Sequence, residues 1–111
     1  MTGPPRAVRP PRAICAIALG SNEGDRAENL RAALAEIRKE PVLVLGAVSR
    51  AYETAPVGDI EQPDFLNAAA LLASTVPPRA TLEALLAIER RLGRVRDPSR
   101  RYGPRVIDID L

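Results

Sequence analysis

The sequence predicts an α+β fold in which one antiparallel sheet carries both helices on the same face. Three observations support this prediction. Short apolar runs of strand length alternate with two longer segments whose apolar residues recur at helical spacing. Glycine and proline residues separate these segments. The resulting order, β-α-β-β-α-β, is that of the split βαβ or ferredoxin-like arrangement, and 111 residues suffice for one modest core.

The first strand and the first helix are indicated by an apolar run and by a capping pattern. Residues 13–19 (AICAIAL) are continuously apolar, so we expect a buried strand that stops at Gly20, where turn residues follow. Asp25 with Glu28 three residues later predicts a helix N-terminus of the capping-box type. Helical spacing of apolar residues extends this helix to about Lys39.

Two strands and a long loop are expected in the middle of the chain. Residues 42–53 form an apolar segment that predicts one strand, with Gly46 as a bulge or irregularity. Residues 54–65 are marked by proline, glycine and aspartate, and loops of this length in small domains usually serve function. Residues 66–75 are rich in alanine and leucine, but we predict a strand because prolines end the segment and a better helix follows.

The second helix and the last strand complete the order. A helix is predicted over residues 78–92, because proline opens it and Gly93 provides a C-terminal cap. In the strand that ends the chain, Asp108 and Asp110 share one face, because successive strand residues point to opposite sides. The other face receives Ile107, Ile109 and Leu111.

The two aspartates and the loop before them predict a site for a nucleotide polyphosphate. Neighbouring carboxylates repel unless a cation lies between them, and Mg²⁺ is typically held by one or two carboxylates with water and phosphate oxygens. Seven of the sixteen lysine and arginine residues lie between Arg90 and Arg105, and guanidinium groups bind phosphate bidentately. The alternatives are a solvent-exposed edge strand for the aspartates and an RNA-binding patch for the arginines.

Composition limits the chemistry and the location of the protein. Without histidine, the chain cannot form a Ser-His or Cys-His nucleophile, and a zinc site is disfavoured. Its single cysteine cannot form an internal disulfide. The net charge of +2 gives no indication of nucleic acid, and no apolar run approaches the ~20 residues of a membrane span. We expect residues 1–12 to be a disordered Pro/Arg-rich tail and the protein to be cytoplasmic.

Three blocks of sequence together resemble one enzyme family. They are ALGSN at residues 18–22, ETAPVG with QPDFLNA at residues 53–68, and R-x-x-x-x-RYGPRVIDIDL at residues 96–111. The blocks resemble those of the 6-hydroxymethyl-7,8-dihydropterin pyrophosphokinases, which transfer pyrophosphate from ATP to the pterin in folate biosynthesis. The family core is ferredoxin-like, in agreement with the order of elements predicted above.

The resemblance implies roles for residues on the nucleotide side of a site. Asp108 and Asp110 would hold two Mg²⁺ ions that bridge the phosphates of ATP. The arginines Arg94 and Arg105 would bind the phosphates and stabilise the charge that develops during transfer. The residues assigned to ATP binding are Glu89, Arg94, Tyr102 and Arg105.

On the pterin side, the resemblance implies four further residues. Asn67 would recognise the pterin through its side-chain amide, while Phe65 would stack on the ring. Thr54 and Val57 would offer backbone groups to the same ligand. The partners implied are therefore the small molecules ATP and the pterin, with no nucleic acid or membrane, and the family suggests a monomer.

The family pattern continues past Leu111 with further strands and a helix. We therefore expect residues 13–111 to be a pyrophosphokinase core that lacks the C-terminal part of the family. The alternatives to an active transferase are an inactive fragment or a ferredoxin-like module that binds nucleotide or pterin. An RNA-binding domain is the third class of function.

Overall fold

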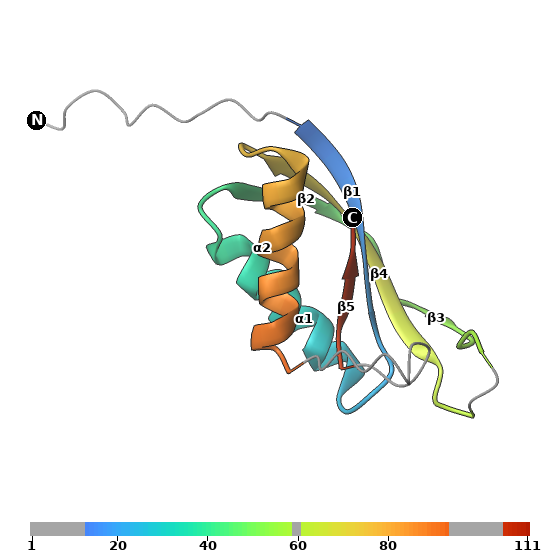
Figure 1. Ribbon diagram of the computed structural model, residues 1–111. Helices are drawn as coiled ribbons and strands as arrows, with labels where there is room; N and C mark the ends of the chain where they lie inside the picture. Colours follow the sequence, from blue (N-terminus) through green and yellow to red (C-terminus); the bar gives the residue numbers. More distant parts are fainter. Residues whose placement is uncertain (1–12, 59–60, 94–105) are drawn as a thin grey trace, which may run out of the picture.

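The computed structural model describes residues 13–58, 61–93 and 106–111. One twisted sheet carries both helices on the same side (Figure 1). This arrangement confirms the predicted α+β fold. The elements in chain order are β1 (Ala13–Ser21), α1 (Arg26–Lys39), β2 (Leu43–Val48), β3 (Tyr52–Thr54), β4 (Phe65–Ser74), α2 (Pro78–Arg91) and β5 (Asp108–Asp110).

The sheet is antiparallel throughout its described pairs and has β1 and β4 at its centre. Four of its five strands follow the order β2-β4-β1-β5, and the fifth, β3, pairs with β4. The two central strands pair without interruption from Ala13 opposite Ser74 to Ser21 opposite Leu66. The strand β5 pairs with the other edge of β1, although most of the chain separates the two strands in sequence.

The core fills the space between the helices and one face of the sheet. Alternate strand residues point to this face, so Ile17 of β1 and Leu72 of β4 are buried against Ile37 of α1 and Ile88 of α2. Residues of the opposite face, such as Ala18, are exposed. We call the two sides the covered face and the open face.

The sequence prediction for residues 42–53 as one strand was wrong. The register shifts between Leu45 and Val48, at the irregularity expected for Gly46, and β2 then ends. In the gap before β3, the backbone N–H of Ser49 donates to the carbonyl of Ala69 at 2.8 Å, and the Ser49 hydroxyl accepts from Ala69 N at 2.8 Å. The side chain thus replaces one ladder bond where the strand is interrupted.

A second correction concerns Gly20, which does not end the first strand. The strand β1 continues to Ser21, and Gly20 is paired on both sides, with Asn67 of β4 and with Asp108 of β5. Two neighbouring strands satisfy the backbone here, so the turn begins later than the composition suggests.

The helix ends follow the predicted signals. Asp25 caps α1, because its carboxylate accepts a hydrogen bond from Glu28 N at 3.1 Å. The carboxylate of Glu28 pairs with Arg31 on the helix surface. Pro78 opens α2, and Gly93 follows the end of this helix with a φ of 94°. In the part of the chain that the structure describes, no helix is long and apolar enough to cross a membrane.

Candidate active site

One row of residues crosses the open face and joins the two halves of the predicted site. Tyr52 pairs with Asn67, Asn67 with Gly20, and Gly20 with Asp108. Directly paired residues project on the same side of a sheet, so Asn67 and Asp108 face the same space with Gly20 between them. Adjacent strands lie about 4.8 Å apart, which puts the Cα atom of Asn67 roughly 10 Å from the Cα atom of Asp108.

The remaining described site residues flank this row. Thr54 pairs with Phe65 on one side of it, next to Asn67. On the other side, Asp110 lies opposite Ala18. The structure thus brings Thr54, Phe65 and Asn67 together at one end of the open face and both aspartates at the other.

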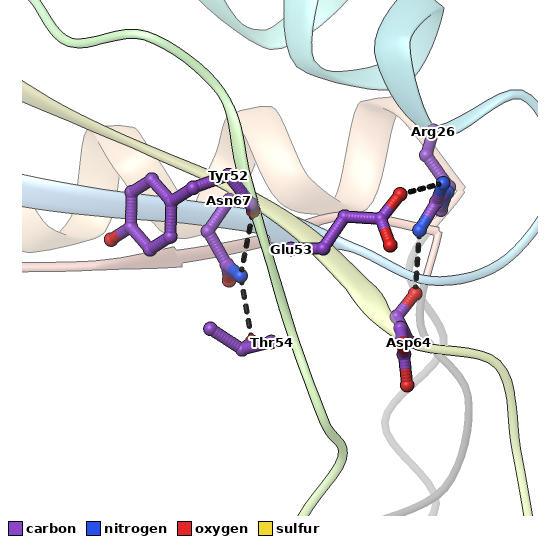
Figure 2. Close-up of polar contacts among 6 residues, drawn as sticks. All are labelled: Arg26, Tyr52, Glu53, Thr54, Asp64 and Asn67. Carbon is purple, nitrogen blue, oxygen red and sulfur yellow. Dashed lines mark hydrogen bonds and ion pairs between the residues drawn. The ribbon is translucent and has the colours of Figure 1, made fainter.

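The side chain of Asn67 is held by the neighbouring strand. Its amide nitrogen donates to the hydroxyl of Thr54 at 2.7 Å and to the backbone carbonyl of Tyr52 at 3.3 Å (Figure 2). These bonds use both amide hydrogens and direct the carbonyl oxygen of Asn67 towards Gly20. The group that this arrangement offers to a ligand is therefore the carbonyl oxygen, a hydrogen-bond acceptor.

Gly20 is a site residue that sequence reasoning missed. A Cβ atom at this position would lie 3.0 Å from Oδ1 of Asn67 and 3.3 Å from Cδ1 of Phe65. Those groups therefore occupy the space that a side chain at Gly20 would need. A glycine inside an otherwise apolar strand is the signal that indicates such a close approach.

Glu89 supports the strand that carries the aspartates. Its side chain is 2% exposed, and Oε2 accepts a hydrogen bond from the backbone N–H of Ile109 at 2.6 Å. Ile109 lies between the two aspartates and points into the core. Although the family resemblance places Glu89 near ATP, the contact described here joins α2 to β5.

The two aspartates form a donor set that fits Mg²⁺. Asp108 is partly buried and Asp110 is exposed, and both project from the open face. Residues 13–58, 61–93 and 106–111 contain no group of three or more side chains that could enclose a metal ion. Two carboxylates without a closed protein cage suit Mg²⁺, which completes its shell with water and phosphate oxygens.

Other predicted residues lie away from the row or outside the described chain. Val57 is 72% exposed and belongs to the connection after β3. Arg94, Tyr102 and Arg105, which the resemblance assigns to ATP, lie outside the described residues.

Comparison with known proteins identifies a family. The family model described as 7,8-dihydro-6-hydroxymethylpterin-pyrophosphokinase matches residues 16–111. Among curated proteins, the chain is similar to the 2-amino-4-hydroxy-6-hydroxymethyldihydropteridine pyrophosphokinases of Methylorubrum extorquens, Bacillus subtilis and Pseudomonas aeruginosa, with 46%, 43% and 43% identity. The alignments cover 86–88% of this chain.

These alignments cover 57–59% of the three relatives, so the chain spans well under two thirds of their length. The family model nevertheless covers the whole described fold from within β1 onward, including the row from Asn67 to Asp108. On this match, the chain belongs to the 7,8-dihydro-6-hydroxymethylpterin-pyrophosphokinase family.

Proposed function

We propose that the chain forms the core of an enzyme that transfers a pyrophosphoryl group from ATP to 6-hydroxymethyl-7,8-dihydropterin. The products are AMP and the pterin diphosphate. The observation that carries the proposal is the row Asn67–Gly20–Asp108 on the open face. This row sets a fixed hydrogen-bond acceptor and a carboxylate about two strand spacings apart, facing the same space.

The half of the site around Asn67 and Phe65 suits a flat heteroaromatic ring such as the pterin. Phe65 is adjacent to Asn67 on the open face, so its ring is available for stacking while the carbonyl oxygen of Asn67 accepts from a ring or exocyclic N–H. The bonds from Asn67 to Thr54 and Tyr52 keep this acceptor in place before the ligand arrives. Val57 is proposed as a further backbone contact in the same half.

The aspartates form the phosphate half. Asp108 and Asp110 would hold Mg²⁺, which supplies charge neutralisation to the phosphates when it is bound. The pterin hydroxyl oxygen forms a bond to the β-phosphorus of ATP, the bond from that phosphorus to the oxygen of AMP breaks, and the hydroxyl proton is released. The protein thus contributes mainly positioning and charge neutralisation, as expected for phosphoryl transfer, and this fits a sequence without histidine.

Finer features of the proposal rest on the family motif. We assign ATP to Tyr102 and Arg105, and two Mg²⁺ ions to Asp108 and Asp110, because R-x-x-x-x-RYGPRVIDIDL at residues 96–111 matches the family pattern there. Glu89 and Arg94 precede this motif, and their assignment to ATP rests on the family resemblance alone. We further propose a monomer in the cytoplasm that acts on small molecules, without nucleic acid or membrane as partners.

The function is tested with the purified chain, ATP, Mg²⁺ and 6-hydroxymethyl-7,8-dihydropterin. Formation of AMP that depends on the pterin supports the transferase. Pterin binding measured by calorimetry without AMP formation would instead favour a binding module. A folded chain that neither binds pterin nor forms AMP would overturn the proposal.

A further inference from the structure

A single guanidinium joins the two ends of the connection between β3 and β4. Arg26 is the first residue of α1. Its Nη2 atom lies 2.9 Å from Oε1 of Glu53 in β3, and its Nη1 atom donates to the backbone carbonyl of Asp64 at 2.9 Å (Figure 2). Asp64 immediately precedes β4. The planar fork of arginine makes both contacts at once, which the single ammonium group of lysine is poorly shaped to do.

These contacts reach β3 from the side of the sheet opposite to the proposed pterin site. Tyr52 and Thr54 share the open face with Asn67, whereas Glu53 lies between them and projects to the other side. Arg26 therefore has no described bond to a side chain of the proposed pterin site. It acts on the site through the backbone, at Glu53 of β3 and at Asp64, which immediately precedes Phe65.

The strand β3 depends on such support. It has three residues, all of them exposed, and it pairs with β4 at three positions. Short two-stranded pairings are only marginally stable on their own. Thr54 of β3 nevertheless supplies the 2.7 Å bond that orients Asn67. A displacement of β3 would therefore remove the partner of the Asn67 amide.

The position of Arg26 is itself set by the turn after β1. Asn29 donates to the hydroxyl of Ser21 at 3.0 Å and to the carbonyl of Glu23 at 2.8 Å, which fixes this turn against α1. The buried side chain of Asn22 donates to Gln62 Oε1 at 2.8 Å and to the carbonyl of Pro63 at 3.0 Å. Asn22 thus holds the side of the connection next to β4, while Arg26 reaches both sides.

We propose that Arg26 is a positioning residue for pterin binding. It bridges Glu53 and Asp64, so that β3 holds Asn67 in its binding orientation. This inference rests on the proposed function, because it takes the pterin as the ligand of Asn67. The ion pair is partly exposed, with side-chain exposures of 31% for Arg26 and 57% for Glu53, and such surface pairs contribute little to global stability. Its effect is therefore expected in pterin binding more than in unfolding.

The test compares Arg26→Ala with Arg31→Ala. Both variants remove one arginine from α1, but the described partner of Arg31 is Glu28 on the same helix. We expect Arg26→Ala to weaken pterin binding by roughly 2- to 5-fold, the range typical of one exposed charged pair. Binding of Mg²⁺ with ATP, and pterin binding by Arg31→Ala, should stay unchanged.

Two further variants separate positioning from general destabilisation. Arg26→Lys keeps the charge but not the fork, so we expect it to recover pterin binding only in part. Combining Arg26→Ala with Glu53→Ala should weaken binding no more than Arg26→Ala does alone, because both changes remove the same bridge. Fully additive losses, or equal losses for pterin and for Mg²⁺ with ATP, would overturn the inference.

A measurement without ligand keeps the inference testable even if the function is wrong. In NMR spectra of the ligand-free chain, the side-chain amide protons of Asn67 should exchange faster with solvent in Arg26→Ala than in Arg31→Ala. Equal exchange rates would refute the positioning role. Failure of the unaltered chain to bind pterin would overturn the proposed function alone, since the Asn67 amide would still report on Arg26.

Discussion

The two faces of the sheet are formed by alternate residues of the same strands, but they differ in composition and in whether helices cover them. On the covered face, large apolar side chains such as Ile17 and Leu72 are sealed by the helices. On the open face, small and polar residues such as Gly20, Asn67 and Asp108 form the row that crosses the strands. Substitutions on the covered face should therefore change stability, whereas those on the open face should change binding and catalysis.

The largest effect is expected on the open face at Asp108. Asp108→Asn removes a carboxylate from the proposed metal site, and we expect AMP formation to fall on the order of 10²–10³-fold, as for loss of one group that stabilises transition-state charge. Thermal unfolding should still show a folded protein, because the large apolar side chains that form the core lie on the covered face. Quantifying AMP beside thermal unfolding checks both statements, and an Asp108→Asn protein of full activity would refute the metal assignment.

Glu89 tests the covered face. Glu89→Ala leaves the buried N–H of Ile109 without its 2.6 Å acceptor, which should lower the free energy of unfolding by about 1–3 kcal/mol. Glu89→Gln keeps an acceptor oxygen and should cost less. Urea denaturation measures both variants, with the exposed Glu83→Ala on the same helix as the control. If Glu89→Ala and Glu83→Ala unfold alike, the bond does not hold β5.

Gly20 sharpens the comparison, because a change of one methyl group should affect the ligand more than the fold. In Gly20→Ala the new Cβ would lie 3.0 Å from Oδ1 of Asn67, so this oxygen must move, and we expect pterin affinity to fall by about 10-fold, or roughly 1.4 kcal/mol. Gly46→Ala is the matched control, because its Cβ would meet the carbonyl of Leu71 at 3.3 Å. Calorimetric titration should show weakened binding for Gly20→Ala only.

The smallest effect is expected at Glu36 of α1, which pairs with Arg91 of α2 on the surface of the two helices. A hydrogen bond from Arg91, and then one from Lys39, lowers the pKa of Glu36 below its ordinary value. A lowered pKa in the folded state means that the ionised form contributes stability above the ordinary pKa of glutamate and loses it as the pH falls through the folded-state value. Glu36→Gln should therefore reduce the acid-induced decrease in the urea midpoint, and an identical decrease in both proteins would contradict this.

Most of the fold could be predicted because its signals are local. Asp25 caps α1 through a residue three positions away, and the prolines that bound α2 act on their own backbone. The alanine-rich segment predicted over residues 66–75 is a strand because β1 and β2 pair with both of its edges. The break after Val48 escaped prediction, since it depends on Ser49 bonding to Ala69 in another strand.

The site was predicted less completely, for the same reason. The strand pattern pointed to both aspartates and the family resemblance pointed to Asn67, but the residues that hold them act from a distance. Glu89 bonds Ile109 across twenty positions, and Arg26 reaches Glu53 and Asp64 from the first turn of another element. Such contacts form only when distant strands and helices pack together. They therefore produce no repeating pattern of residues from which they could be predicted.

The row across the open face also sets a length. The separation of Asn67 and Asp108 equals two strand spacings, roughly 10 Å, and backbone hydrogen bonds of β4, β1 and β5 determine it. A side-chain substitution can change the chemical group at either end of this row, but it does not change the backbone distance between the two ends. The sheet therefore fixes the distance between the two ends of the proposed site, whichever side chains line it.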